Sequence, residues 1–112
     1  LINLESLKDF ESRSGLSIDH ERFRPNIVID GMKPFQELEL AKKKIKIGDT
    51  LFEVFCNTPR CKATIYPYQS IISDFNLPEK LNEVYGHIDF GIYLKPISSG
   101  HINLDDTFSI SE

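Results

Sequence analysis

The segment KKKIKIGDTLFEVFC, residues 42–56, constrains the fold more than any other part of this chain. Two isoleucines alternate with lysines before Gly48 and Asp49, and an apolar run follows that pair. Alternation with a period of two separates the side chains of a strand onto two faces, and a Gly–Asp pair between two such runs indicates a tight turn. The segment therefore predicts a β-hairpin with one buried face.

Other short segments have the composition of strands. Residues 27–29 are β-branched and end at a turn signal, and residues 62–66, 90–97 and 101–110 are also rich in strand-forming types. Such a series of short strands, with little helical pattern between them, is typical of a barrel or a strongly curved sheet. We therefore predict a mainly β fold, a β-barrel with two short helices.

The two helices have recognisable boundaries. Residues 3–14 carry apolar side chains at helical spacing, with Asn3 as the N-cap and Gly15 as the stop. Pro78 opens the second helix and Gly86 ends it. Both helices are short, so they decorate the predicted barrel rather than form a layer of their own.

Length and charge limit the classes of function. A chain of 112 residues forms one domain, residues 1–112, because domains typically contain about 100–150 residues. A net charge of −4 argues against nucleic-acid binding, which usually needs a basic surface. No apolar run reaches the roughly 20 residues that span a bilayer, and no signal peptide is visible. We expect a cytoplasmic protein with no membrane contact.

The stretch CNTPRC holds both cysteines, Cys56 and Cys61. A zinc site would need ligands from scattered histidines, and a disulfide is disfavoured in the cytoplasm. Cys56 continues the alternation of a strand, which indicates a packing residue. Cys61 follows Pro59 and Arg60 beyond the strand, and a neighbouring guanidinium favours the thiolate that ligates metals or attacks. On the residues alone, Cys61 is either functional or a second packing thiol.

The stretch RFRPN, residues 22–26, offers a second candidate site. Pro25 disfavours a helical backbone at Arg24, so we expect an extended segment with Arg22 and Arg24 on one side. Arg24 and Asn26 then share a face, and a guanidinium with an amide suits a phosphate or another oxyanion. Pairing of Arg24 with surface carboxylates is the alternative.

Five blocks of this sequence, in order, resemble the MOSC domain, which is named for the C-terminus of molybdenum cofactor sulfurase. They are RFRPNIVIDG, IKIGDTLFEV, TPRCKATIYP, YGHIDFGIYLKP and GHINLDDTF. The likeness is greatest to stand-alone bacterial MOSC proteins and extends to the mitochondrial amidoxime-reducing component. The family's domain normally begins before the segment LINLESL, so we expect this chain to lack the first strands of the barrel.

The resemblance implies a β-barrel with a cleft for the molybdenum cofactor. It places the molybdenum or sulfur ligand at Cys61, which becomes both the catalytic and the metal-binding candidate. It assigns the phosphate end of the cofactor to Arg24, Asn26 and Arg60. These assignments agree with a loop thiol beside an arginine and with a guanidinium–amide pair.

Three functions follow. The first is a domain that binds the molybdenum cofactor or carries sulfur. Its reaction would be a molybdenum-dependent reduction of N-hydroxylated substrates, or the transfer of sulfur or cofactor. Its partner would be a redox or sulfur-transfer protein. The second is a non-catalytic interaction module, and the third a metal-free barrel that binds a small anion. Without its first strands the sheet leaves an edge at residues 27–30 or at the C-terminal strand. We expect the 3–14 helix to cover it in a monomer, ahead of a homodimer through sheet edges.

Overall fold

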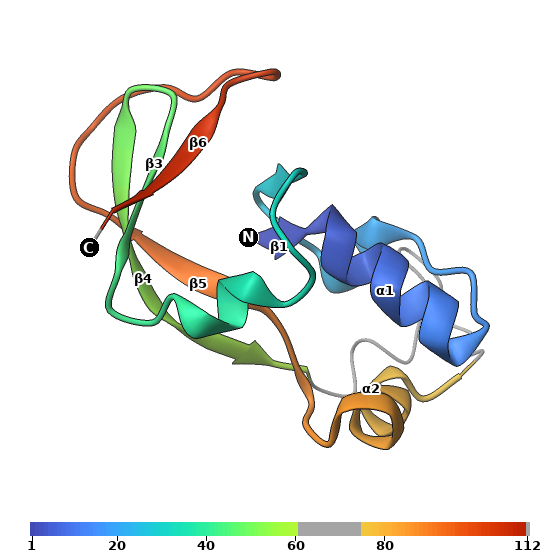
Figure 1. Cartoon of the computed structure of the whole chain (residues 1–112). Coiled ribbons are helices and arrows are strands. Elements are labelled where there is room, and N and C mark those ends of the chain that lie inside the picture. The colour runs from blue at the N-terminus through green and yellow to red at the C-terminus, as the bar shows by residue number, and fades with distance from the viewer. Residues whose placement is uncertain (61–74, 112) are drawn as a thin grey trace.

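The computed structural model describes residues 1–60 and 75–111, and Figure 1 shows the arrangement of its elements. The helices are α1 (Leu4–Ser14) and α2 (Leu77–Tyr85), with short 3-10 turns at η1 (His20–Phe23) and η2 (Gln36–Glu39). The strands are β1 (Ile2–Asn3), β2 (Val28–Ile29), β3 (Lys44–Ile47), β4 (Thr50–Pro59), β5 (Asp89–Pro96) and β6 (Phe108–Ser111). The two helices lie together at one end of the molecule and the large sheet at the other, with β1 between them. The fold is a small mixed α/β domain.

The predicted hairpin is confirmed as β3 and β4, which pair antiparallel with Ile45 opposite Phe52. Ile45 and Ile47 are buried, whereas Lys44 and Lys46 are exposed, as the alternation in the sequence requires. β5 and β6 add to the two sides of this hairpin and give an antiparallel sheet in the order β5-β4-β3-β6. The hairpin therefore forms the centre of the sheet, and its apolar face supplies one side of a core.

The first residues of the chain join the sheet to a second, smaller one. Leu1 and Ile92 of β5 exchange two main-chain hydrogen bonds of 2.9 Å, one in each direction. Ile2 then donates to the carbonyl of Ile27 at 2.9 Å, and β1 runs parallel to β2. Leu1 to Asn3 thus connect β5 on one side with β2 on the other.

The described residues form no closed barrel. They give an open four-stranded sheet and a separate two-stranded parallel pair. 3-10 turns form at residues 20–23 and 36–39, and β2 between them has only two residues for pairing. Residues 101–107, predicted as part of a strand, are irregular, and the Asp106 amide donates to the Asn103 carbonyl in a turn. The predicted strand over 62–66 lies outside the described residues.

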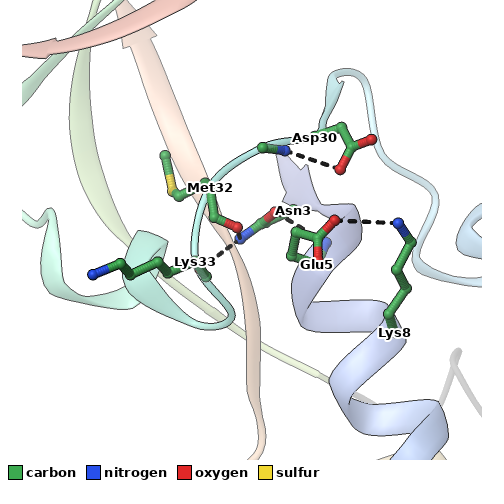
Figure 2. Close-up of polar contacts among 7 residues, drawn as sticks. Asn3, Glu5, Lys8, Asp30, Met32 and Lys33 are labelled. Atoms are coloured by element: carbon green, nitrogen blue, oxygen red, sulfur yellow. Dashed lines mark hydrogen bonds and ion pairs between the residues drawn. The ribbon is translucent and has the colours of Figure 1, made fainter.

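α1 begins and ends where the sequence predicts. The Asn3 side chain accepts from the Glu5 amide at 3.1 Å, and Gly15 ends the helix in the left-handed conformation with φ +75°. The Asn3 amide nitrogen also donates to the carbonyls of Met32 and Lys33, at 3.2 and 2.9 Å. Figure 2 shows this side chain between the helix start and the loop that follows β2. One cap therefore also fixes that loop.

A buried carboxylate completes the same joint. Glu37 is fully buried, and its two oxygens accept from the Asn3 amide at 3.0 Å and from the Ser6 hydroxyl at 2.5 Å. The Ser6 hydroxyl in turn accepts from the Phe35 amide at 2.8 Å. A charge buried this deeply needs such partners, because desolvation is otherwise costly. We call Asn3, Ser6 and Glu37 the cap network.

α2 also matches its predicted boundaries. The Asn76 side chain caps it by accepting from Glu79, Pro78 lies in its first turn, and Gly86 ends it with φ +77°. The Tyr85 hydroxyl donates to Asp9 of α1 at 2.6 Å. The two helices are thereby linked at the surface as well as through their apolar faces.

Two apolar clusters form the interior. The helical core lies among α1, α2, η1 and the start of β5, and its buried members are Ile2, Leu7, Phe10, Ile18, Phe23, Leu77, Leu81 and Phe90. The sheet core lies under β3, β4 and β5, and its buried members are Ile29, Met32, Leu40, Ile45, Ile47, Phe52, Val54 and Ile92. No helix in the described part of the chain is long and apolar enough to cross a membrane.

Candidate functional site

A cleft of about 430 Å³ opens where the helical core meets the sheet core. Its polar lining comes from Arg24, Asn26, Thr58 and Arg60. Its apolar lining includes Phe23, Phe52, Ile92 and Tyr93. The cleft is therefore built from four segments that are far apart in the sequence: the first residues of the chain, the turn after η1, β4 with Arg60, and β5. Ligand sites commonly occupy about 300–1,000 Å³ and combine apolar walls with a few polar groups.

Arg24 stands at the end of η1 in an unusual conformation. Its φ and ψ are 50° and 53°, and its amide donates to the Glu21 carbonyl at 2.9 Å, which closes the 3-10 turn. The prediction that Arg24 is extended before Pro25 is therefore wrong, because the cap of η1 overrides the preference set by the proline. A positive φ at a residue other than glycine costs on the order of 1–3 kcal/mol and tends to occur at functional sites.

The prediction that Arg22 and Arg24 lie on one side of an extended segment is also wrong. Arg22 is only 4% exposed; its Nη2 donates to the Phe75 carbonyl at 3.2 Å, and its guanidinium carbon lies 3.8 Å from the centre of the Phe75 ring. Arg24 is exposed and lines the cleft. A 3-10 helix, with three residues per turn, replaces the period of two that the prediction assumed.

Asn26 is exposed and lines the same cleft two residues after Arg24. The carbonyl of the next residue, Ile27, accepts from Ile2 at 2.9 Å. This bond fixes the end of the turn against β1. The guanidinium and the amide that the sequence selected as an oxyanion pair thus border one cavity.

Arg60 also lines the cleft, but its guanidinium is directed at the main chain. Nε and Nη2 donate to the Phe90 carbonyl at 2.8 and 2.5 Å, and Nη1 donates to the Phe23 carbonyl at 3.0 Å. The guanidinium carbon lies 5.0 Å from the centre of the Phe23 ring. Arg60 therefore spans from β5 to the turn that carries Arg24.

The electrostatics of this region favour an anion. Burial, and then the charge of Arg60, lowers the pKa of the Leu1 amino group to about 6. The same two influences would disfavour any added cation beside Arg60. Arg24 lines the same cleft, so two guanidinium groups border a partly enclosed space, where charge–charge attraction is stronger than in bulk water.

Gly91 does not line the cleft but packs against Leu1 and Arg60, which do, and the sequence predictions missed it. Its φ is +86°, and a Cβ added there would lie 2.7 Å from the Leu1 carbonyl oxygen and 3.0 Å from Arg60 Nη2. Only glycine fits between these two groups. A lone glycine inside a strand pattern indicates a bulge or a close approach of other atoms, and that signal was present in the sequence.

Of the two cysteines, Cys56 lies within the described residues. Cys61 lies outside the described residues. Cys56 is a free, half-buried thiol on β4. A bulge after Val54 shifts the pairing with β5, so that Cys56 lies opposite the exposed Tyr93, and the neighbouring Phe55 is 66% exposed. Within residues 1–60 and 75–111, no group of three or more His, Cys, Asp or Glu side chains could hold a metal ion.

Comparison with known proteins gives one family. A family model described as the MOSC domain matches residues 1–109. The chain is 31% identical over 103 residues to a molybdenum cofactor sulfurase from Drosophila mojavensis, an alignment that covers 88% of this chain and 13% of that protein. It is 39% identical over 71 residues to a molybdenum cofactor sulfurase from Oryza sativa subsp. japonica, covering 55% of this chain and 8% of that protein. The chain thus spans a small fraction of these relatives.

Proposed function

This chain belongs to the MOSC domain family, and we propose that it binds the molybdenum cofactor in the cleft between its two cores. The observation that supports this most is that Arg24, Asn26 and Arg60 line one cleft. In this proposal Arg24 and Asn26 bind the phosphate end, and Cys61 is the ligand of the metal or the carrier of sulfur.

The residues present fit the anionic end of that cofactor. An arginine can donate two parallel hydrogen bonds to a phosphate, and the Asn26 amide nitrogen can donate a third. Phe52 and Ile92, both buried, give apolar walls beside these groups. Apolar walls exclude water and strengthen the attraction between phosphate and guanidinium.

The role of Cys61 rests on its sequence position and on the family. It directly follows Arg60, whose guanidinium stays protonated at all physiological pH values. A nearby positive charge lowers the pKa of a thiol and favours the thiolate, which is the form that ligates metals. When bound, the cofactor would supply two-electron redox chemistry or a transferable sulfur.

Two reaction classes are open to such a domain. One is the reduction of N-hydroxylated substrates, and the other is the transfer of sulfur or of the cofactor. Either requires a second protein that supplies electrons or exchanges sulfur. The relatives named molybdenum cofactor sulfurase point to the second class. This chain, however, aligns with only 13% or less of the length of those proteins. The monomeric state belongs to the same proposal.

Metal and pterin analysis of the chain, purified without refolding from a host that makes the cofactor, tests this function. We expect pterin and molybdenum in the unaltered chain. Cys61→Ser should lose molybdenum and keep much of the pterin, whereas the matched Cys56→Ser should keep both. Arg24→Lys should lower the pterin content about tenfold, since a point charge cannot replace a bidentate fork. A chain without pterin, or equal losses in the two serine variants, would show the proposal to be wrong.

A further inference from the structure

The turn that carries Arg24 and Asn26 is held by a side chain from a distant part of the sequence. Arg60 Nη1 donates to the Phe23 carbonyl across 37 positions of the chain, and Nε and Nη2 donate to Phe90 across 30. Hydrogen bonds from a charged donor are stronger than neutral ones. The guanidinium therefore ties the turn to β5.

One of these bonds, from Arg60 Nη1 to the Phe23 carbonyl, acts on the peptide plane that joins Phe23 to Arg24. The Phe23 carbonyl and the Arg24 amide belong to the same planar unit, because the peptide bond does not rotate. Arg60 holds the carbonyl end at 3.0 Å, and the Glu21 carbonyl accepts from the amide end at 2.9 Å. With both ends held, rotation of this plane is opposed, and the plane is one side of the torsion that gives Arg24 its positive φ of 50°.

The backbone of β5 lets the same guanidinium approach closely at Gly91. Gly91 follows the Phe90 carbonyl that accepts two of the three bonds. A Cβ at Gly91 would come to 3.0 Å from Arg60 Nη2 and to 2.7 Å from the Leu1 carbonyl oxygen. The absence of a side chain at position 91 therefore leaves room for the Arg60 guanidinium to reach the Phe90 carbonyl.

We propose that Arg60 is a positioning residue: it holds the Arg24–Asn26 turn in the shape that binds an anion, and it acts through Arg24 rather than as a ligand of its own. This inference rests on the proposed function, and it changes the role of Arg60 from the direct phosphate contact that the family resemblance implied. Lysine cannot take its place, because a single ammonium cannot match a planar fork directed at two carbonyls.

Titration of inorganic phosphate into the 15N-labelled chain, followed by NMR, separates positioning from direct contact. We expect Arg24→Lys and Arg60→Lys each to weaken phosphate binding about tenfold. The double variant should be no more than about twofold weaker than Arg24→Lys alone, because one change acts through the other. Losses that multiply to about a hundredfold would overturn the proposal.

Amide exchange at Arg24 supplies a readout that direct contact would not change. Arg60→Lys should speed exchange of this amide about tenfold without phosphate present, since the peptide plane is released. Gly91→Ala should do the same while it leaves both charges in place, and Arg13→Lys on the surface of α1 is the control. Unchanged Arg24 exchange in a folded Arg60→Lys chain would overturn the proposal. If the unaltered chain does not bind phosphate, the proposed function fails, and the exchange experiment still decides the role of Arg60.

Discussion

The helical core and the sheet core are built from different side chains and meet at one strand. Phe10, Phe23 and Phe90 dominate the first, and Phe90 stacks on Phe23 with ring centres 4.2 Å apart. The second is mostly aliphatic, with Ile45 and Ile92 fully or almost fully buried. Phe90 and Ile92 are two positions apart on β5, yet they belong to different cores.

That boundary explains where the cleft lies. The helical core packs against the turn of Arg24 on one side, and the sheet core packs against β4 and β5 on the other. Arg60 bonds to Phe90 at the boundary, and Leu1 bonds to Ile92 just beyond it. The difference between the cores shows that the site depends on both, so damage to either should change the cleft as well as stability.

Phe90→Ala should give the largest effect on stability. The ring is fully buried and contacts the rings of Phe23, Phe10 and Phe35, so its loss leaves a cavity that the surrounding side chains cannot fill. We expect the free energy of unfolding, measured by urea denaturation, to fall by about 3–5 kcal/mol. Ile45→Val in the sheet core is the comparison and should cost about 0.5–1.5 kcal/mol. A Phe90 variant as stable as Ile45→Val would mean that the aromatic cluster is not a single packed unit.

Changes in the cap network should give the next largest effect. Glu37→Ala leaves the buried Asn3 amide and Ser6 hydroxyl without their carboxylate, and we expect unfolding to need about 2–3 kcal/mol less. Glu37→Gln keeps the shape, and rotation of the Ser6 hydroxyl lets it accept from the new amide. This variant should lose roughly 1 kcal/mol. Equal losses for Ala and Gln in thermal or urea unfolding would show that the negative charge, rather than the hydrogen bonds, joins α1 to the loop.

Local sequence signals predicted some of these features, and contacts between distant residues decided the others. The hairpin and the two helices depend on signals within a few residues, such as the Ile–Lys alternation, the cap at Asn3 and the stop at Gly15. The positions of Arg24, Arg22 and Glu37 depend on partners 30 or more positions away, at Arg60, Phe75 and Asn3. The preference set by Pro25 placed Arg24 in extended backbone, whereas the cap of η1, whose Phe23 carbonyl also accepts from Arg60, gives it a positive φ.

The candidate site divides in the same way. Arg24, Asn26 and Arg60 were selected from residue chemistry and family resemblance, and the fold brings all three to one cleft. Their cofactor-binding roles stay predictions. The orientation of the Arg60 guanidinium toward two carbonyls, and the need for glycine at position 91, follow from packing between segments that the sequence pattern does not connect.

Tyr85→Phe should give the smallest effect, and it depends on pH. Burial, and then the hydrogen bond to Asp9, raises the pKa of Tyr85 well above its ordinary value of 10.0. Stability from this group is therefore present below about pH 10 and is lost as the pH rises further, because the unfolded chain ionises first. We expect the variant to be at most about 1 kcal/mol less stable at neutral pH. The gap between the two proteins should narrow above pH 10, and a gap that stays constant to high pH would contradict this assignment.

The central claim is that the cleft at the boundary of the two cores binds the phosphate end of a pterin. NMR chemical-shift mapping tests it most directly, with a synthetic pterin phosphomonoester titrated into the 15N-labelled chain. The largest amide shifts should fall on residues 23–27, 58–60 and 91–94, and Arg24→Lys should need about tenfold more ligand to reach the same shifts. Shifts that gather instead on β3, β6 or α2, or that persist unchanged in Arg24→Lys, would contradict the claim.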